Sequence, residues 1–232
     1  MSVGLNLNID KTFSGTKRNH SNLTFSQNNT SNPVPPKTKF VAAASSIAGT
    51  ILPILLIAKH QKKELKFNSW KNINNILNIK YGIKEMTIVS GSAVVAGVLG
   101  GCLSDKEHKR RHKIKEGVFQ FLNATLPTIV VGGIMKHLEG TKKLNTVPHK
   151  IAGVVAGLVI GMPLAAMVAN KITDPKDLEE DRKINAKDLV VNIDDALGAL
   201  VLAKIPIVDK LHAEKLLPAI YAWCGYRAGK HE

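Results

Sequence analysis

Residues 40–58 read FVAAASSIAGTILPILLIA, a run without a charged side chain that lies between Lys39 and Lys59. Three further runs have the same character: MTIVSGSAVVAGVLGGCL at 86–103, GVFQFLNATLPTIVVGGIM at 117–135 and IAGVVAGLVIGMPLAAMVA at 151–169. A helix rises about 1.5 Å per residue, so each run approaches the length that crosses a hydrocarbon core of about 30 Å. A soluble bundle would need amphipathic helices to cover four such segments, and little of the 232-residue chain is left for them. We therefore expect an all-α, multi-pass transmembrane helical bundle with four spans.

Two weaker apolar segments follow, which raises the number of apolar segments to six. Residues 189–208 include Asp194, Asp195 and Lys204, whose insertion cost roughly cancels the gain from their apolar neighbours. Residues 216–226, LLPAIYAWCGY, are too few to cross as a helix. We expect this second segment to be interfacial or re-entrant, with its aromatic rings near the lipid headgroups.

The amino-terminal residues differ in composition from the rest of the chain. Residues 1–38 are rich in Asn, Ser, Thr and Lys and bury too little apolar surface to offset the entropy lost on ordering. We expect a disordered polar tail at 1–38 and a helical membrane domain at 39–232. Only two cysteines are present, Cys102 and Cys224, which excludes a disulfide scaffold.

The chain carries 32 Lys and Arg against 18 Asp and Glu, a formal net charge of +14. With four spans, most of the Lys and Arg fall on the same side as the amino terminus, and the positive-inside rule then makes that side cytoplasmic. With six spans the bias is weaker, because residues 204–215 move to the other side. We expect an integral membrane protein with a cytoplasmic amino terminus.

The apolar runs also resemble one another. AVVAGVLGG at 93–101 matches GVVAGLVIG at 153–161, and KEGVFQFLNA at 115–124 matches KDLVVNIDDA at 187–196. This pattern predicts a duplicated helical hairpin, with copies at 86–135 and 151–208. Stripes of small residues, which favour close helix packing, occupy matching positions in the two copies: Gly153, Gly157 and Gly161, and Ala93, Gly97 and Gly101. A pore or sliding surface is the functional alternative to simple packing.

The same alignment pairs Gln120 with Asn192, and Asn123 with Asp195. Ionisable groups at membrane depth usually face a bundle interior, a water path or a counter-ion. One hypothesis is therefore an intramembrane cation or proton site formed by Asp194, Asp195, Asn192, Gln120 and Asn123. Its counter-ions would be Lys204, His212 and Arg227. The alternative is that 188–208 is a solvated amphipathic helix.

The loop at 104–116, SDKEHKRRHKIKE, is strongly basic. We expect Lys109, Arg110, Arg111 and Lys113 to contact anionic lipid headgroups of the bilayer. Nucleic acid is not an expected partner, because the positive charge is spread over every loop and no aromatic stacking platform accompanies it. His108 and His112 have no third ligand nearby, so we expect no metal.

No catalytic motif is present in a suitable context, and we expect neither an enzyme nor a cofactor. Two functions remain. The first is translocation of a small ion or solute, and the second is a non-catalytic role in organising the membrane or binding partners through the basic loops. Assembly into a homo-oligomer is compatible with either function.

Overall fold

The computed structural model describes residues 34–63, 65, 78–105, 110–176, 193–205, 208 and 210–230, with the side chains of 193–195 excepted. Across these ranges the secondary structure is helical and contains no strand. Nearly all of the predicted polar tail lies outside the described residues. Its last residues are helical, because α1 begins at Pro36, where a missing N–H costs no hydrogen bond.

Four long helices form the body of the molecule: α1 (Pro36–His60), α3 (Ile83–Ser104), α4 (Arg110–Gly140) and α5 (Val147–Thr173). All four are long and apolar enough to cross a membrane. The predicted all-α bundle with four spans is thereby confirmed, and the chain is a multi-pass integral membrane protein. Prolines inside α1, α4 and α5 do not interrupt these helices.

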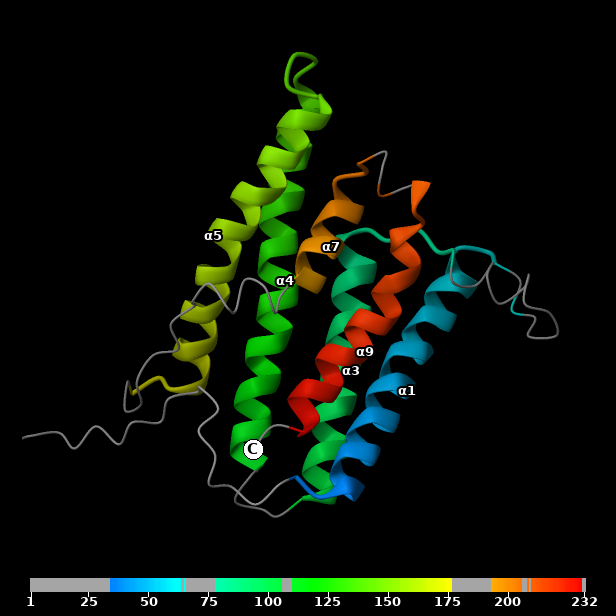
Figure 1. The fold of residues 1–232 in the computed structure, drawn as a ribbon, viewed down its shortest axis with the longest axis vertical. Coiled ribbons are helices and arrows are strands. Elements are labelled where there is room, and N and C mark those ends of the chain that lie inside the picture. Colours follow the sequence, from blue (N-terminus) through cyan, green and yellow to red (C-terminus); the bar gives the residue numbers. More distant parts are fainter. Residues whose placement is uncertain are drawn as a thin grey trace, which may run out of the picture.

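The helices are arranged in two groups that meet at α4. α1 packs on α3, α5 packs on α4, and α4 also contacts α3. Figure 1 shows the α4–α5 hairpin reaching beyond the other helices at one end. Hydrogen bonds tie α1 to its surroundings at both ends: Thr38 Oγ1 donates to the Ser104 carbonyl (3.1 Å), and Gln61 bonds both backbone groups of Lys80 (2.8 and 2.9 Å). We call these the Pro36 end and the His60 end of the bundle.

Large apolar side chains cover the outside of the bundle. Examples on α1 and α5 are Phe40, Leu52, Leu56, Val159 and Met167, each more than 60% exposed. A water-soluble protein seldom exposes such contiguous apolar surface, whereas lipid chains solvate it at no cost.

The carboxyl-terminal region adds three short elements: α7 (Ile193–Leu202), the 3₁₀ helix η2 (Ala213–Leu216) and α9 (Leu217–Lys230). α7 and α9 have ten and fourteen residues, too few to span alone. α9 nevertheless packs along both α3 and α1 (Figure 1).

Residues 216–226 were expected to be interfacial or re-entrant, and the structure places them inside the bundle rather than along its surface. Leu217 and Tyr221 are buried in one core cluster with Ile54 and Met86, so Tyr221 is not at the headgroups. The Ser46 hydroxyl of α1 donates to the Ala222 carbonyl (2.6 Å), which fixes α9 between the long helices. We call the space between α1 and α3 that α9 occupies the groove. The length of the segment gave no indication that it would enter the bundle there.

Small residues allow α9 to approach α3 closely. A Cβ added to Gly97 would collide with the Gly225 carbonyl, and one added to Gly101 would collide with the Gly229 carbonyl. Gly225 itself lies against the Ala93 carbonyl. The predicted stripe Ala93, Gly97 and Gly101 thus faces a second stripe on α9.

The stripe on α5 has a different partner. Gly153 faces Met135, Gly157 faces Val131 and Gly161 faces Pro127, all on α4. Both stripes therefore lie at helix–helix contacts, where the missing side chains let backbones approach and gain dispersion energy.

The direction of α9 changes the predicted topology. Its first residues lie near Ile54 and Met86, and Gly229 lies near Ala42 and Gly97, so α9 runs from the His60 end to the Pro36 end. Consistently, burial and the nearby Glu214 carboxylate raise the pKa of the Tyr81 hydroxyl just before α3. The four spans stand as predicted, but η2 lies at the His60 end, and not at the Pro36 end where the count of Lys and Arg with four spans had placed all residues after 170.

Replacing Gly97 with Ala is expected to destabilise the bundle by roughly 1–3 kcal/mol, because the new methyl group overpacks the contact with Gly225. The matched control is Gly133→Ala on α4, since a Cβ there meets nothing within 4 Å. The control should be neutral or slightly stabilising, because Ala is the better helix former. Unfolding of both variants in mixed detergent micelles, followed by circular dichroism, measures the difference. Equal stabilities would contradict the close α3–α9 contact.

Candidate functional site

Three polar side chains on one face of α4 lie inside the bundle. Glu116, Gln120 and Asn123 are 4%, 3% and 0% exposed, and their spacing of four and three residues places them on one helix face. We call them the α4 polar face. A carboxyl group and two amides buried in an apolar membrane bundle are costly unless they are hydrogen-bonded or bind something.

The carboxylate and the first amide of this face are in contact. Gln120 Nε2 donates a hydrogen bond of 2.6 Å to Glu116 Oε1, one helical turn away. A carboxylate acceptor makes such a bond stronger than one between neutral groups. The bond also leaves the Gln120 carbonyl oxygen as a neutral acceptor beside the acid.

The α4 polar face extends from one end of the span towards its middle. Glu116 directly precedes the apolar run 117–135. Asn123 lies seven residues further along, about 10 Å deeper along the helix axis. Polar oxygen atoms are thus distributed over about a third of the hydrocarbon thickness.

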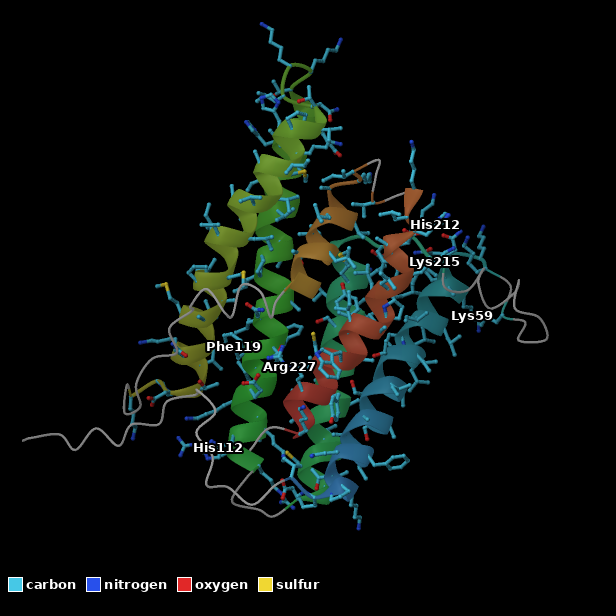
Figure 2. All side chains as sticks on the ribbon, in the orientation of Figure 1. Lys59, His112, Phe119, His212, Lys215 and Arg227 are labelled. Carbon is cyan, nitrogen blue, oxygen red and sulfur yellow. The ribbon has the colours of Figure 1, made fainter. Side chains whose placement is uncertain are left out.

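The neighbours of α4 show which way this face is turned. On one flank Gly117 lies against Val94 and Val98 of α3, and on the other Phe119 clusters with Ala166 and Ala169 of α5. The polar face lies between these flanks, in the interior shared with α9. Figure 2 shows Arg227 in the space between α9 and α4, and Phe119 between α4 and α5.

Of the three predicted counter-ions, only Arg227 lies at this end of the bundle. Lys204 and His212 are exposed, and His212 and η2 lie at the His60 end (Figure 2). Of the three, Arg227 is therefore the one that lies on the side of α9 towards α4.

Part of the predicted intramembrane site falls outside the described residues. Asn192 is not described, and only the backbone of Asp194 and Asp195 is, in the first turn of α7. Gly132 of α4 faces Leu202, and α7 runs in the same direction as α4 (Figure 1). Asp195 is seven residues before Leu202, about 10 Å along the axis. The first turn of α7 therefore lies at about the depth of residues 124–126 of α4, just beyond Asn123.

The predicted repeat is only partly described for the same reason. In the second copy, residues 187–192 lie outside the described ranges, so the pairing of Gln120 with Asn192 has no structural counterpart to compare. The elements that are described differ in length: α4 spans, whereas α7 is a short helix packed on α4 and α5.

The basic loop is also only partly described, since Lys109 lies outside the described ranges. Arg110 and Arg111 are exposed, and Arg110 Nε donates to the Cys102 carbonyl (3.2 Å). The expectation that Lys113 contacts headgroups is wrong. Its ammonium group is completely buried and lies 3.0 Å from Asp105 Oδ2, whose side chain is 4% exposed.

This ion pair joins the end of α3 to the first turns of α4, one turn before Glu116. Sequence analysis placed both residues in the basic loop at 104–116, assigned Lys113 to the lipid headgroups and did not single out Glu116. Together with Gln120 and Asn123, these two residues follow helical spacing. This spacing could have indicated that the helix begins before the apolar run.

Within the described ranges, no group of three His, Cys, Asp or Glu side chains is placed to hold a metal ion. The polar face offers one carboxylate and two amide oxygens. Such a set suits a proton or a weakly held monovalent cation better than a tightly coordinated metal.

Comparison of the chain with protein-family models, with curated proteins and with solved structures gives no match.

Replacing Lys113 with Met should destabilise the protein strongly, by roughly 3–5 kcal/mol, because Asp105 would lose the ammonium group it faces inside the bundle. The matched control is Lys150→Met, which removes the looser pair with Glu139 at 3.9 Å. That longer and partly exposed pair should contribute less than about 1 kcal/mol. Detergent unfolding of the two variants provides the comparison, and similar losses would contradict a buried Lys113–Asp105 pair.

Proposed function

We propose that this membrane protein moves a small cation or a proton across the bilayer along the α4 polar face, and that it is not an enzyme. The observation that carries the proposal is the buried Glu116–Gln120 contact, with Asn123 one turn deeper. Ionisable groups inside a membrane bundle typically mark ion or proton pathways.

The chemistry of the face suits a cation. The Glu116 carboxylate supplies negative charge at the mouth of the path, and the carbonyl oxygens of Gln120 and Asn123 replace part of the water shell further in. A proton would instead bind to the carboxylate oxygen.

Asp194 and Asp195 extend the proposed path. The backbone of the first turn of α7 lies near the depth of Asn123, where the α4 polar face ends, and we include both acids in the proposal on that ground. Beyond this depth, an apolar cluster that includes Val131, Met135 and Ala199 fills the bundle towards the His60 end. Passage therefore requires α7 to shift against α4.

The same apolar cluster favours the second candidate function. A bundle closed by this cluster of packed side chains could serve as a static component that organises lipid or partners through its basic ends. Copies of the chain could assemble through lipid-facing surfaces under either proposal.

Flux through proteoliposomes separates the two functions. Purified protein should conduct at least one of H⁺, Na⁺ and K⁺ above protein-free liposomes, and Glu116→Gln should lower that flux by at least about tenfold, because an amide cannot supply the negative charge. The matched control is Glu139→Gln, the same change at an exposed position near the far end of α4, which should leave flux unchanged.

Equal flux through the Glu116→Gln variant and the wild type would exclude a path along the α4 polar face. Absence of flux in the wild type for all three ions would favour the static role.

We further propose that the Pro36 end faces the cytoplasm, supported by the basic residues 104–116 at that end. Because η2 lies at the His60 end, Lys210 and Lys215 lie at that end too. The excess of Lys and Arg at the Pro36 end is therefore smaller than the sequence predicted.

Sided labelling tests this orientation. In a background with Cys102 and Cys224 replaced by Ala, Thr141→Cys should react with a membrane-impermeant maleimide on intact cells. Lys37→Cys should react only after permeabilisation. Both positions are exposed, so accessibility differs only by side. The reverse pattern would invert the topology.

A further inference from the structure

The carboxyl-terminal part of α9 presents aromatic and basic side chains on its outer face. Trp223, Tyr226 and Lys230 follow helical spacing, opposite the glycines that pack on α3. Arg227 lies at the edge of this face that borders α4. The Trp223 side chain is about half exposed, and its ring lies 5.5 Å from that of Tyr226. Trp and Tyr rings in this setting are typical of the membrane–water interface.

Lys230 lies against both rings. Its ammonium nitrogen is 4.8 Å from the Tyr226 ring centroid and 5.7 Å from that of Trp223. Cation–π contacts hold the ammonium group at the end of α9. This position is near the end of α3, because the preceding Gly229 packs against Gly101, two residues before the end of the apolar run 86–103.

Two further cations lie near Lys230. The start of α1 lies beside the end of α9, because Gly229 packs against Ala42, one turn after Lys39. Arg227 precedes Lys230 by one turn on α9. Consistently, burial and these two cations lower the pKa of Lys230. Lys39 is exposed in the first turn of α1, directly before the apolar run, and that turn has no acidic residue. The N-terminal N–H groups of α1 add further positive potential. Three like charges gathered at one point repel one another unless an anion binds between them.

We propose that Lys39, Arg227 and Lys230, with the rings of Tyr226 and Trp223, form a binding site for the phosphate group of an anionic phospholipid at the Pro36 end of the bundle. The guanidinium binds two phosphate oxygens in its planar fork, and the two ammonium groups supply point charges. The aromatic rings and the adjacent exposed Phe40 contact the glycerol and the first part of the acyl chain. The apolar contact distinguishes a lipid from free phosphate.

This site differs from the predicted headgroup contacts in the loop at 104–116, and it does not depend on ion movement. It would anchor α9, and with it the groove between α1 and α3, to the anionic leaflet.

Thermal unfolding of the full-length protein in neutral detergent tests the site. Added short-chain phosphatidylglycerol should stabilise the wild type, whereas phosphatidylcholine and inorganic phosphate at the same concentration should not. The triple variant Lys39→Gln, Arg227→Gln, Lys230→Gln should lose about tenfold to a hundredfold in apparent affinity for phosphatidylglycerol.

The matched control removes three lysines at the opposite end of the bundle, all of them exposed: Lys136→Gln, Lys142→Gln and Lys143→Gln. It should retain the affinity of the wild type. If both triple variants lose affinity equally, net charge alone explains the effect and the site is refuted. Equal stabilisation by inorganic phosphate would refute a lipid ligand.

A folding failure of the triple variant does not prevent the test. The single variant Lys39→Gln changes an exposed side chain and should show a smaller loss of affinity, and the charge-preserving Arg227→Lys should retain part of the binding. A further single variant, Arg227→Gln, completes the set. If Lys39→Gln and Arg227→Gln both bind phosphatidylglycerol as tightly as the wild type, the proposal is overturned.

Discussion

Close contact between the backbones of α3 and α9 is the constraint on which the rest of the bundle depends. Helices in lipid gain little from burying apolar side chains, so their association relies on dispersion contacts that small residues make possible. Gly97 and Gly101 lie against Gly225 and Gly229, where any side chain would collide with a carbonyl oxygen. This contact brings a helix too short to span into the groove beside α1, and it places η2 at the His60 end.

The position of α9 in turn determines the surroundings of α4. With α9 in its groove, Arg227 lies in the space towards α4, and the buried Glu116 and Gln120 face the same interior. A carboxylate and two amides would be far more costly against lipid than in this interior. The tight glycine contact and the polar groups are therefore two parts of one arrangement.

Charge is distributed by the same geometry. The long helices separate two polar ends of the bundle. Because α9 runs towards the Pro36 end, Arg227 and Lys230 lie there, close to Lys39. Lys113 is instead buried, where it forms an ion pair with Asp105. A basic residue near a span can thus serve as an internal ion-pair partner or as a surface cation, and local sequence does not distinguish the two.

The sequence by itself determined the class of the protein, because uncharged runs of eighteen residues or more have few alternatives to crossing a bilayer as helices. It also indicated the small-residue stripes and the polar residues Gln120 and Asn123, since helical spacing is visible in one dimension. Only the tertiary structure decided that residues 217–230 enter the bundle, that Glu116 is buried and that Lys113 is paired. These features depend on which helices become neighbours, and that choice is made by contacts between segments more than a hundred residues apart, such as Gly97 and Gly225.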